Sequence, residues 1–270
     1  MHECTFKSTN NDYLFARTLD FSFELEPEFV FFPRHYPLSL GIDNITNSDH
    51  YAFMGLAKNI GSYQMADGIN EHGLAAAALY FKGYASYADE AIDGTIGIAP
   101  EQLVQLVLAQ CKSIRDIKAL FKNYTILSTK LDFIGTVLPL HWSFHDIHGD
   151  KAVLEITHIG THFYENELGV LANSPDYIWH ETNVRNYISL DPNQESPKTL
   201  FGKEFKAFGQ GSGTFGLPGD STSPSRFIRT LYNKLSAKGV DTKEELLIQG
   251  VHILNDLDIE ESKSLGAIYL

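Results

Sequence analysis

The stretch CTFKSTNNDYLFARTLD, residues 4–20, stands near the start of the chain and decides its fold. The middle of this stretch, residues 8–12, consists of Ser, Thr, Asn, Asn and Asp. Asn and Asp tolerate left-handed backbone and bond to their own chain, so these residues predict a turn. Folded as a hairpin, the stretch returns Arg17 and Asp20 to the neighbourhood of Cys4.

Two interpretations of Cys4 follow from these neighbours. The thiolate is the reactive form of cysteine, and a nearby guanidinium such as that of Arg17 lowers the pKa of a thiol. The carboxylate of Asp20 is then available to orient a base. Alternatively, Cys4 is a buried apolar residue beside a surface ion pair, because cysteine is among the residue types most often buried. The residues alone leave both interpretations open.

The composition is ordinary for a soluble globular protein. The chain has 270 residues, of which 43% are hydrophobic and 20% are charged, so it is long enough to bury a large core. Its 21 Lys and Arg residues against 34 Asp and Glu residues give a net charge of -13. Phosphate binding requires a basic surface, so this charge argues against nucleic acid as a partner.

The sequence shows no sign of a membrane or secretory segment. Residues 1–4 have neither a basic nor a long apolar region, and no run of about 18 apolar residues occurs. Cys4 and Cys111 are too few for a disulfide framework in a chain of this length. We therefore expect a cytoplasmic protein without a membrane partner.

Most of the chain is predicted to form short strands that follow one another. Residues 74–81, LAAAALYF, are ambiguous, because alanine favours helices whereas the short length and flanking glycines fit a strand packed on both faces. We assign them to a strand. The other expected strands are residues 28–33, which we expect to be buried, 51–57, 62–66, 140–147, 152–157, 161–164 and 169–172.

Three helices complete the predicted elements. Residues 100–123 have a proline at the start and an apolar stripe at helical spacing, and this stripe buries Cys111. Two more helices are predicted at residues 223–238 and 242–256, each with a capping residue at its start. Sequential strands with few helices and no linker predict a single α+β domain over residues 1–270, with layered sheets.

Two other patterns do not indicate sites. The sequence GSGTFG at residues 211–216 matches the dinucleotide-binding fingerprint, but no strand precedes it and a proline follows where the helix should begin. We predict a loop there. His141, His145 and His148 lie close in sequence but do not converge as metal ligands do, so we interpret them as structural or surface residues.

Two isolated polar residues lie at the ends of predicted elements. Asn173 follows an apolar strand and precedes Ser174 and a proline, so its amide is placed to face a cleft. Arg226 lies in the first turn of the helix at residues 223–238, where the helix dipole disfavours a cation. We therefore expect Arg226 to have another partner, such as a carboxylate.

Several segments of the chain form an ordered set of motifs, namely CT at 4–5, ARTLDF at 16–21, ADGINEHGL at 66–74, LANSPD at 171–176, FGQG at 208–211, GLPGD at 216–220 and SRF at 225–227. This set resembles the choloylglycine hydrolase family, whose members include penicillin V acylases and conjugated bile salt hydrolases. The resemblance runs from Cys4 to about Leu254. It implies the N-terminal nucleophile hydrolase fold, an αββα sandwich of two antiparallel sheets between helix layers, and a homotetramer.

The resemblance also implies a cysteine amidohydrolase that uses neither a metal nor a cofactor. Cys4 would be the nucleophile once residues 1–3, a short propeptide, are removed. Its freed α-amino group would then serve as the general base, since an α-amine has a pKa near 8. Arg17 would lie beside the sulfur, and Asp20 would hold the amino group.

Three further residues complete the implied site. Asn173 and the backbone N–H of Tyr80 would form the oxyanion hole for amide hydrolysis through a thioester. Arg226 would belong to the same polar network. Tyr80 also favours a penicillin V acylase over a bile salt hydrolase, because an aromatic wall suits the flat phenoxyacetyl group.

Other activities are compatible with the same residues. Hydrolysis of a conjugated bile salt is the alternative, and hydrolysis of acyl-homoserine lactones is a third. If residues 1–3 stay attached, we expect the chain to bind a small amide without cleaving it. The hairpin from Cys4 to Arg17 is a few residues shorter than is usual in the family, and residues 259–270 do not resemble the longer C-terminal part of its members.

Overall fold

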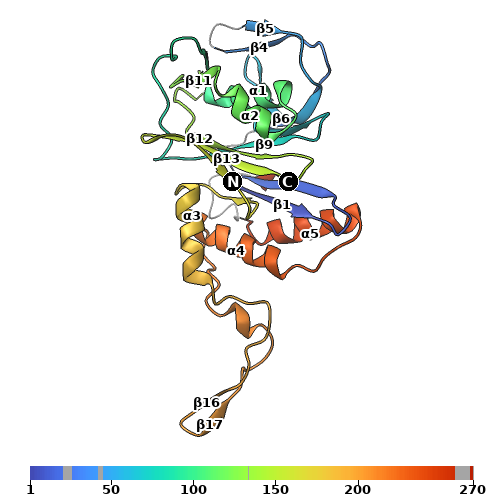
Figure 1. Cartoon of the computed structure of the whole chain (residues 1–270), viewed down its shortest axis with the longest axis vertical. Helices are drawn as coiled ribbons and strands as arrows, with labels where there is room; N and C mark the ends of the chain where they lie inside the picture. The colour runs from blue at the N-terminus through green and yellow to red at the C-terminus, as the bar shows by residue number, and fades with distance from the viewer. Residues whose placement is uncertain (21–25, 42–44, 133, 259–267, 270) are drawn as a thin grey trace.

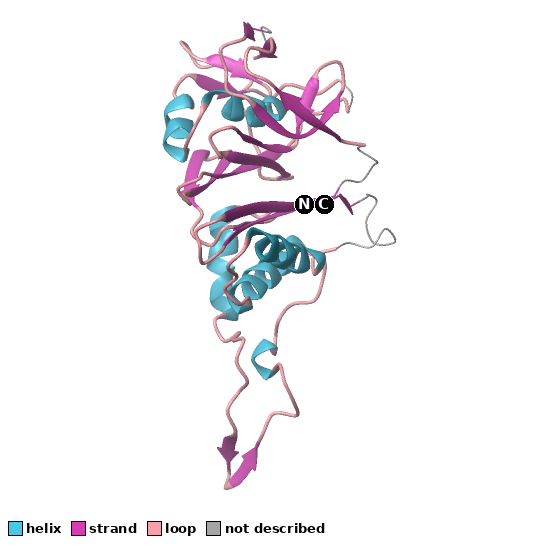
Figure 2. Ribbon diagram, turned by 90° about the vertical axis from the view of Figure 1, so that its right-hand side faces the viewer, coloured by secondary structure: helices cyan, strands magenta, loops and turns pink. Residues whose placement is uncertain are grey.

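The computed structural model describes residues 1–20, 26–41, 45–132, 134–258 and 268–269. Its main elements form four layers, with helices on the two outer faces and two β-sheets facing each other between them (Figure 1, Figure 2). The αββα sandwich that the resemblance implied is therefore confirmed. The first strand of the chain belongs to the lower of these sheets in Figure 1, so it lies between the other sheet and the lower helices.

The larger sheet is antiparallel and has the order β14-β13-β12-β9-β8-β6-β3, with β7 paired to β6. Its strands are β3 (Glu28–Phe32), β6 (Phe53–Asn59), β7 (Tyr63–Met65), β8 (Asp67–Asn70), β9 (Ala75–Tyr80), β12 (Leu140–His145), β13 (Lys151–Thr157) and β14 (Gly160–Glu165). The expectation that residues 28–33 are buried is wrong in part. Because β3 is an edge strand, Phe29 and Phe31 are 68% and 56% exposed.

The alanine-rich segment is the central strand β9, as predicted. Ala76 and Ala78 pack into the core beneath the outer helices, whereas Ala77 and Leu79 face the other sheet. The small side chains allow both neighbouring layers to approach the strand closely, and this need for space outweighs the helix propensity of alanine.

The smaller sheet contains the predicted N-terminal hairpin and has the order β15-β1-β2-β18. Its strands are β1 (His2–Lys7), β2 (Tyr13–Asp20), β15 (Val170–Leu171) and β18 (Ile268–Tyr269). Glu3 pairs with Arg17 and Cys4 pairs with Ala16 across the hairpin. The rest of the C-terminal segment considered above, residues 259–267 and 270, lies outside the described residues, as does Phe21.

Helices cover the outer face of each sheet (Figure 1). The larger sheet is covered by η1 (Pro100–Gln102), α1 (Leu103–Gln110) and α2 (Ile114–Leu120), and the smaller sheet by α4 (Ser223–Ser236) and α5 (Lys243–Asn255). At one side of the molecule lie α3 (Tyr177–Asn183) and η2 (Val184–Tyr187).

The prediction of one continuous helix over residues 100–123 is wrong, because the chain is extended at Cys111, with φ -111° and ψ 147°. The amide of Asn70 donates to the carbonyl oxygens of Leu108 and Cys111, at 2.9 and 2.7 Å, and so takes up acceptors at the end of the first helix. Ser113 then caps α2. Cys111 is nevertheless buried, as predicted.

A long arm, which we define as residues 191–213, extends away from the layers (Figure 1, Figure 2). The N–H of Asp191 donates to the carbonyl oxygen of Gly213 at 3.0 Å and closes the arm at its base. The arm ends in a small hairpin of β16 (Lys198–Leu200) and β17 (Lys203–Phe205). The remaining short elements are β4 (Leu38–Leu40), β5 (Ile45–Asn47), β10 (Ile96–Ile98), β11 (Tyr124–Ile126) and η3 (Ser212–Thr214).

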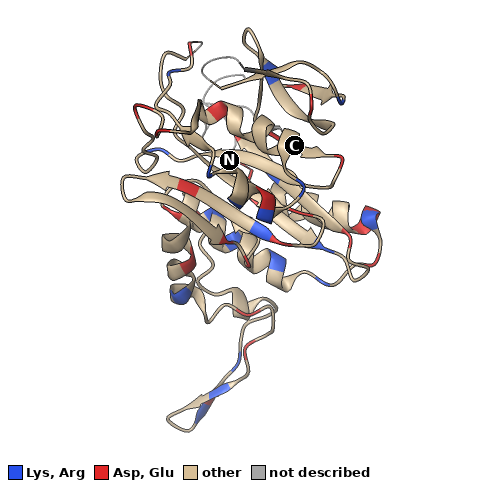
Figure 3. Ribbon diagram, turned by 45° about the horizontal axis from the view of Figure 1, so that its top comes forward, with Lys and Arg blue, Asp and Glu red and all other residues tan. Residues whose placement is uncertain are grey.

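The structure also bears on the other sequence predictions. The dinucleotide-like segment forms a loop with the short helix η3, as expected. Within the described residues, no helix is both long enough and apolar enough to span a membrane. Charged residues of both signs are spread over the layers and the arm (Figure 3). The cytoplasmic location and the single domain over residues 1–270 stay predictions.

Candidate active site

The polar residues that the motifs singled out converge on Met1, which lies at the start of β1 between the two sheets. The α-amino nitrogen of Met1 lies 2.9 Å from Oδ2 of Asp20 and donates to Oδ1 of Asn173 at 3.0 Å. Asp20 also accepts a 3.0 Å hydrogen bond from the hydroxyl of Thr18. The amine and the carboxylate are both almost fully buried, so this contact lies inside the protein rather than at its surface.

Arg17 links the smaller sheet to the larger one at this point. Its guanidinium donates 3.0 Å hydrogen bonds to the carbonyl oxygens of Ala66 and Ala78 and lies 3.5 Å from the carboxylate of Asp67. Nη2 of Arg17 also lies 3.0 Å from the sulfur of Met1. The guanidinium of Arg17, which is fixed by these bonds, therefore lies beside the side chain of Met1.

Asn173 connects three parts of the site. Its Oδ1 accepts a 2.9 Å hydrogen bond from Nη2 of Arg226, and its Nδ2 donates to the carbonyl oxygen of Tyr80 at 2.7 Å. The direct partner of Arg226 is thus an amide oxygen, and the carboxylate of Asp20 acts on Arg226 through its charge. The structure therefore brings Arg17, Asp20, Tyr80, Asn173 and Arg226 together.

The backbone N–H of Tyr80 is oriented toward the end of β8. The N–H of Ala78 donates to the carbonyl oxygen of Ala66 on that side of β9, and N–H directions alternate along a strand. The N–H of Tyr80 therefore points to the same side, beyond the last pair between these strands, Asp67 with Ala77. This orientation suits a donor to a substrate oxygen.

Burial makes the amine of Met1 a proton acceptor. It lowers the pKa of this amine from 8.0 to about 5, and the positive charges of Arg226 and Arg17 act in the same direction, while Asp20 opposes them. At neutral pH the amine is then uncharged and donates an ordinary hydrogen bond to Asp20. An uncharged amine in this position is able to take a proton from a reacting group.

The structure does not bring Cys4 to this group, so the expected proximity of its thiol to Arg17 and Asp20 is wrong. Side chains alternate between the two faces of a strand, and Cys4 faces the apolar layer of α4 and α5 together with Phe6. Its sulfur is fully buried there, and burial raises the pKa of the thiol to about 12. These are properties of a structural core cysteine.

The register of the hairpin keeps Cys4 in this position. Moving β1 by three residues along β2 would bring Cys4 to the place of Met1, but it would also bring Lys7 to the present place of Cys4. Lys7 is exposed, whereas the present place of Cys4 is fully buried among apolar residues. Burying an unpaired ammonium group there is costly, so the apolar pattern of β1 specifies the observed register.

The sequence analysis missed Met1 and two residues that position Asn173. Nε2 of His180 and the hydroxyl of Ser223 both donate to the backbone carbonyl oxygen of Asn173, each at 2.8 Å. No motif pointed to these two residues. The signal for Met1 was present, because alternation along β1 places Cys4 and Phe6 on one face and Met1 and Glu3 on the other.

The three histidines that were interpreted as structural or surface residues lie in different surroundings. Nδ1 of His141 lies 3.0 Å from Glu155, and its ring stacks on Phe81 with centroids 4.2 Å apart. His145 is buried and packs edge to face against Tyr13. His148 lies in the turn between β12 and β13.

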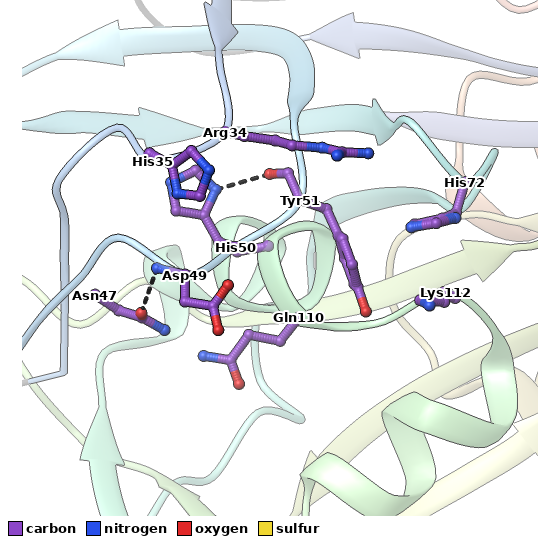
Figure 4. Close-up of a pocket in the computed structure, with 10 residues that line it drawn as sticks. Arg34, His35, Asn47, Asp49, His50, Tyr51, His72, Gln110 and Lys112 are labelled. Carbon is purple, nitrogen blue, oxygen red and sulfur yellow. Dashed lines mark hydrogen bonds between the residues drawn. The ribbon is translucent and has the colours of Figure 1, made fainter.

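A separate cavity of about 500 Å³ contains none of the predicted site residues (Figure 4). Arg34 is paired with Glu71 beside it, and both ring nitrogens of His50 bond backbone carbonyl oxygens at 2.7 Å. The ammonium group of Lys112 lies 5.3 Å from the ring centre of Tyr51. Arg34, His50 and Lys112 therefore already have partners within the chain.

Comparison with known sequences identifies the family. Residues 3–265 match the family described as linear amide C-N hydrolases, choloylglycine hydrolase family. This chain belongs to the choloylglycine hydrolase family. It is 34% identical over 246 residues to a bile salt hydrolase/transferase of Clostridium perfringens, covering 91% of this chain and 75% of that protein. A bile salt hydrolase/transferase of Lactiplantibacillus plantarum is 31% identical over 265 residues, covering 97% and 79%.

Solved structures of this family agree with the fold. A variant of the conjugated bile acid hydrolase of Clostridium perfringens superposes with a TM-score of 0.88 and 31% identity over 96% of this chain and 80% of that chain. A penicillin V acylase from Agrobacterium tumefaciens gives 0.76 and 20% identity over 96% and 73%, a likeness that shows the fold alone.

Two solved variants of the Clostridium perfringens hydrolase supply a spacing. One has a cysteine replaced by alanine, the other has an arginine replaced by leucine, and the two replaced positions lie sixteen residues apart. In this chain Met1 and Arg17 are sixteen residues apart, whereas Cys4 and Arg17 are thirteen apart.

Proposed function

We propose that this site recognises the amide bond between a bile-acid acyl group and a small amine, as in the bile salt hydrolases of the family. The observation that carries the proposal is Asn173, whose amide joins Tyr80, Arg226 and the first residue in one network. Relatives between 31% and 34% identical over most of the chain are named bile salt hydrolases. These relatives favour the alternative activity, hydrolysis of a conjugated bile salt, over hydrolysis of penicillin V. The argument for penicillin V was the aromatic side chain of Tyr80.

The polar groups fit the tetrahedral intermediate of amide hydrolysis. Nδ2 of Asn173 has a second N–H beside the one that it donates to Tyr80, and the N–H of Tyr80 points past the end of β8. A carbonyl oxygen bound between these donors would gain negative charge as the intermediate forms, and fixed donors stabilise that charge. Arg17 and Arg226 add positive charge around the same point.

A second candidate function is binding without cleavage, and Met1 is the observation that favours it. A thioether has no proton to release, so its sulfur is not converted to a thiolate as a cysteine sulfur is. With methionine at position 1, the chain would therefore bind the amide without hydrolysing it.

Calorimetric titration tests recognition. We expect the full-length chain to bind a glycine-conjugated bile acid more tightly than the unconjugated acid or penicillin V. Asn173→Ala should weaken the binding of the conjugate about tenfold, because one hydrogen-bond donor is lost in a partly buried site. Asn186→Ala, an exposed amide in η2, serves as the matched control. Tighter binding of penicillin V would restore the acylase interpretation, and no binding of any of these ligands would contradict both.

A further inference from the structure

We propose that position 1 of this chain is the position of the nucleophile, that Met1 leaves it without a thiol, and that a cysteine there makes the chain an amide-cleaving enzyme. The choice of substrate in the test rests on the proposed function, whereas the assignment of the position does not. Cys4 is, in this inference, a residue of the core.

The contacts of Met1 are those expected of the nucleophilic residue. Its amine is held by Asp20 and Asn173, and its sulfur lies beside the guanidinium of Arg17. The resemblance implied that Arg17 lies beside the sulfur of the nucleophile and that Asp20 holds its amino group. Met1 makes both contacts, and neither is among those described for Cys4. Position 1 therefore has the base, the cation and the oxyanion donors already arranged around it.

The spacing found in the related enzyme supports the same position independently. The cysteine and the arginine replaced in the two solved variants are separated by sixteen residues, as are Met1 and Arg17. The thirteen residues between Cys4 and Arg17 do not match this spacing. An odd difference of three also places Cys4 on the opposite face of the strand.

A cysteine fits position 1 and leaves space for a substrate. The sulfur of cysteine is bonded to Cβ, whereas in methionine Cγ stands there and the sulfur follows one bond further out. A cysteine sulfur would thus occupy the present place of the Met1 Cγ. The volume now filled by the sulfur and methyl group of Met1 would become available to the substrate carbonyl beside Arg17.

The reaction then proceeds in balanced steps. The uncharged α-amine takes the thiol proton, the sulfur bonds to the carbonyl carbon, and the oxygen receives the electron pair of the C=O bond. When the carbonyl re-forms, the C–N bond breaks and the ammonium returns its proton to the leaving amine. Water then attacks the thioester, its proton passes to the α-amine, and the thiolate leaves and is reprotonated.

The test uses full-length chains with a free first residue, released from an N-terminal ubiquitin fusion. Met1→Cys is compared with the printed chain, with Met1→Ala made in the same way, and with Met1→Cys combined with Cys4→Ala. Release of glycine from a glycine-conjugated bile acid is measured. We expect Met1→Cys to be at least about a thousandfold faster than Met1→Ala, because removal of a nucleophile costs at least this much. The Cys4→Ala combination should retain that rate.

A second measurement separates the position from the substrate. Met1→Cys is treated with an activated ester, p-nitrophenyl acetate, and trapped acyl-enzyme is located by peptide mass spectrometry. A thioester at position 1 without release of glycine would support the position and contradict the bile salt function. The inference is overturned if no acyl group forms at position 1. It is equally overturned if the printed chain releases glycine, loses residues 1–3 by intact mass, and becomes inactive on Cys4→Ala.

Discussion

The hydroxyl of Ser143 donates a 2.7 Å hydrogen bond to Oε2 of Glu3 across the interface between the two sheets. Glu3 belongs to β1 and Ser143 to β12, and both side chains are buried. Burial raises the pKa of Glu3 to about 7, although the bond from Ser143 and the charges of Lys234 and Arg17 act against this shift. Glu3 is therefore a titratable group inside the protein.

The variant Glu3→Gln should change how stability depends on pH. Because the pKa of Glu3 is raised in the folded state, wild-type stability falls as pH rises from about 4.5 to 7. Glutamine has no such titration and keeps an oxygen acceptor for Ser143. We expect the variant to gain up to roughly 3 kcal/mol over wild type across this range, at 1.36 kcal/mol per pKa unit.

Urea unfolding at several pH values measures this gain. The Met1 amine has a lowered pKa, so its contribution to stability rises with pH, opposite to that of Glu3. This contribution is present in both proteins, so most of it cancels in the difference between variant and wild type. Glu90→Gln, an exposed position, is the control and should show no such trend. A constant difference between Glu3→Gln and wild type from pH 4.5 to 8 would contradict a titrating Glu3.

The two cysteines should be unreactive in the folded protein. Cys4 and Cys111 are buried, and burial raises the pKa of each thiol to about 12. We expect a chromogenic disulfide reagent at pH 8 to modify neither thiol on a scale of minutes, and to modify both after unfolding in urea. A single fast thiol that disappears in Cys4→Ala, but not in Cys111→Ala, would show that Cys4 is accessible and activated.

Removing the cation of Arg17 should destabilise the contact between the sheets. Arg17→Leu leaves the carbonyl oxygens of Ala66 and Ala78 without their donor and the carboxylate of Asp67 without its cation. We expect a loss of about 3 kcal/mol in the free energy of unfolding, since breaking one half of a buried ion pair typically costs this much. Chemical denaturation measures it. Arg34→Leu, which removes an exposed cation, should leave the midpoint almost unchanged.

The arm should join copies of this chain. Phe201 and Phe208 are 108% and 114% exposed, and large exposed aromatic side chains mark interaction surfaces. We expect light scattering to show an oligomer, with the homotetramer as the proposed state, and Phe201→Asp combined with Phe208→Asp to shift it toward the monomer. Ile159→Asp, at an exposed turn outside the arm, is the control. A monomeric wild-type chain would contradict this role.

Much of the fold was predictable because its signals are local. The turn residues between β1 and β2, the capping residues of α4 and α5, and the glycines around β9 each act on adjacent backbone. The break at Cys111 was not predictable in this way, because it depends on the amide of Asn70, which comes from a distant part of the chain. Tertiary contacts of this kind override a helical pattern.

The polar residues around the site were predictable from the sequence, but the residue at its centre was not. Arg17, Asp20, Tyr80, Asn173 and Arg226 were expected near one another, and the structure places them so. Cys4 was chosen for its chemistry, whereas the face to which a strand residue points depends on register. The apolar residues of β1 determine that register, and they direct Cys4 toward α4 and α5.

The arm leaves and rejoins the protein at one hydrogen-bonded pair, between Asp191 and Gly213. A Cβ at Gly213 would lie 2.1 Å from the carbonyl oxygen of Asp191. Position 213, where the two sides of the arm meet, therefore tolerates only glycine. We therefore expect insertions or deletions within the arm, beyond this hydrogen-bonded pair, to leave the sheets and the residues around Met1 unchanged. Assembly through the arm, as predicted above, and recognition of a substrate near Met1 would therefore be separable traits, on which mutation and selection could act independently.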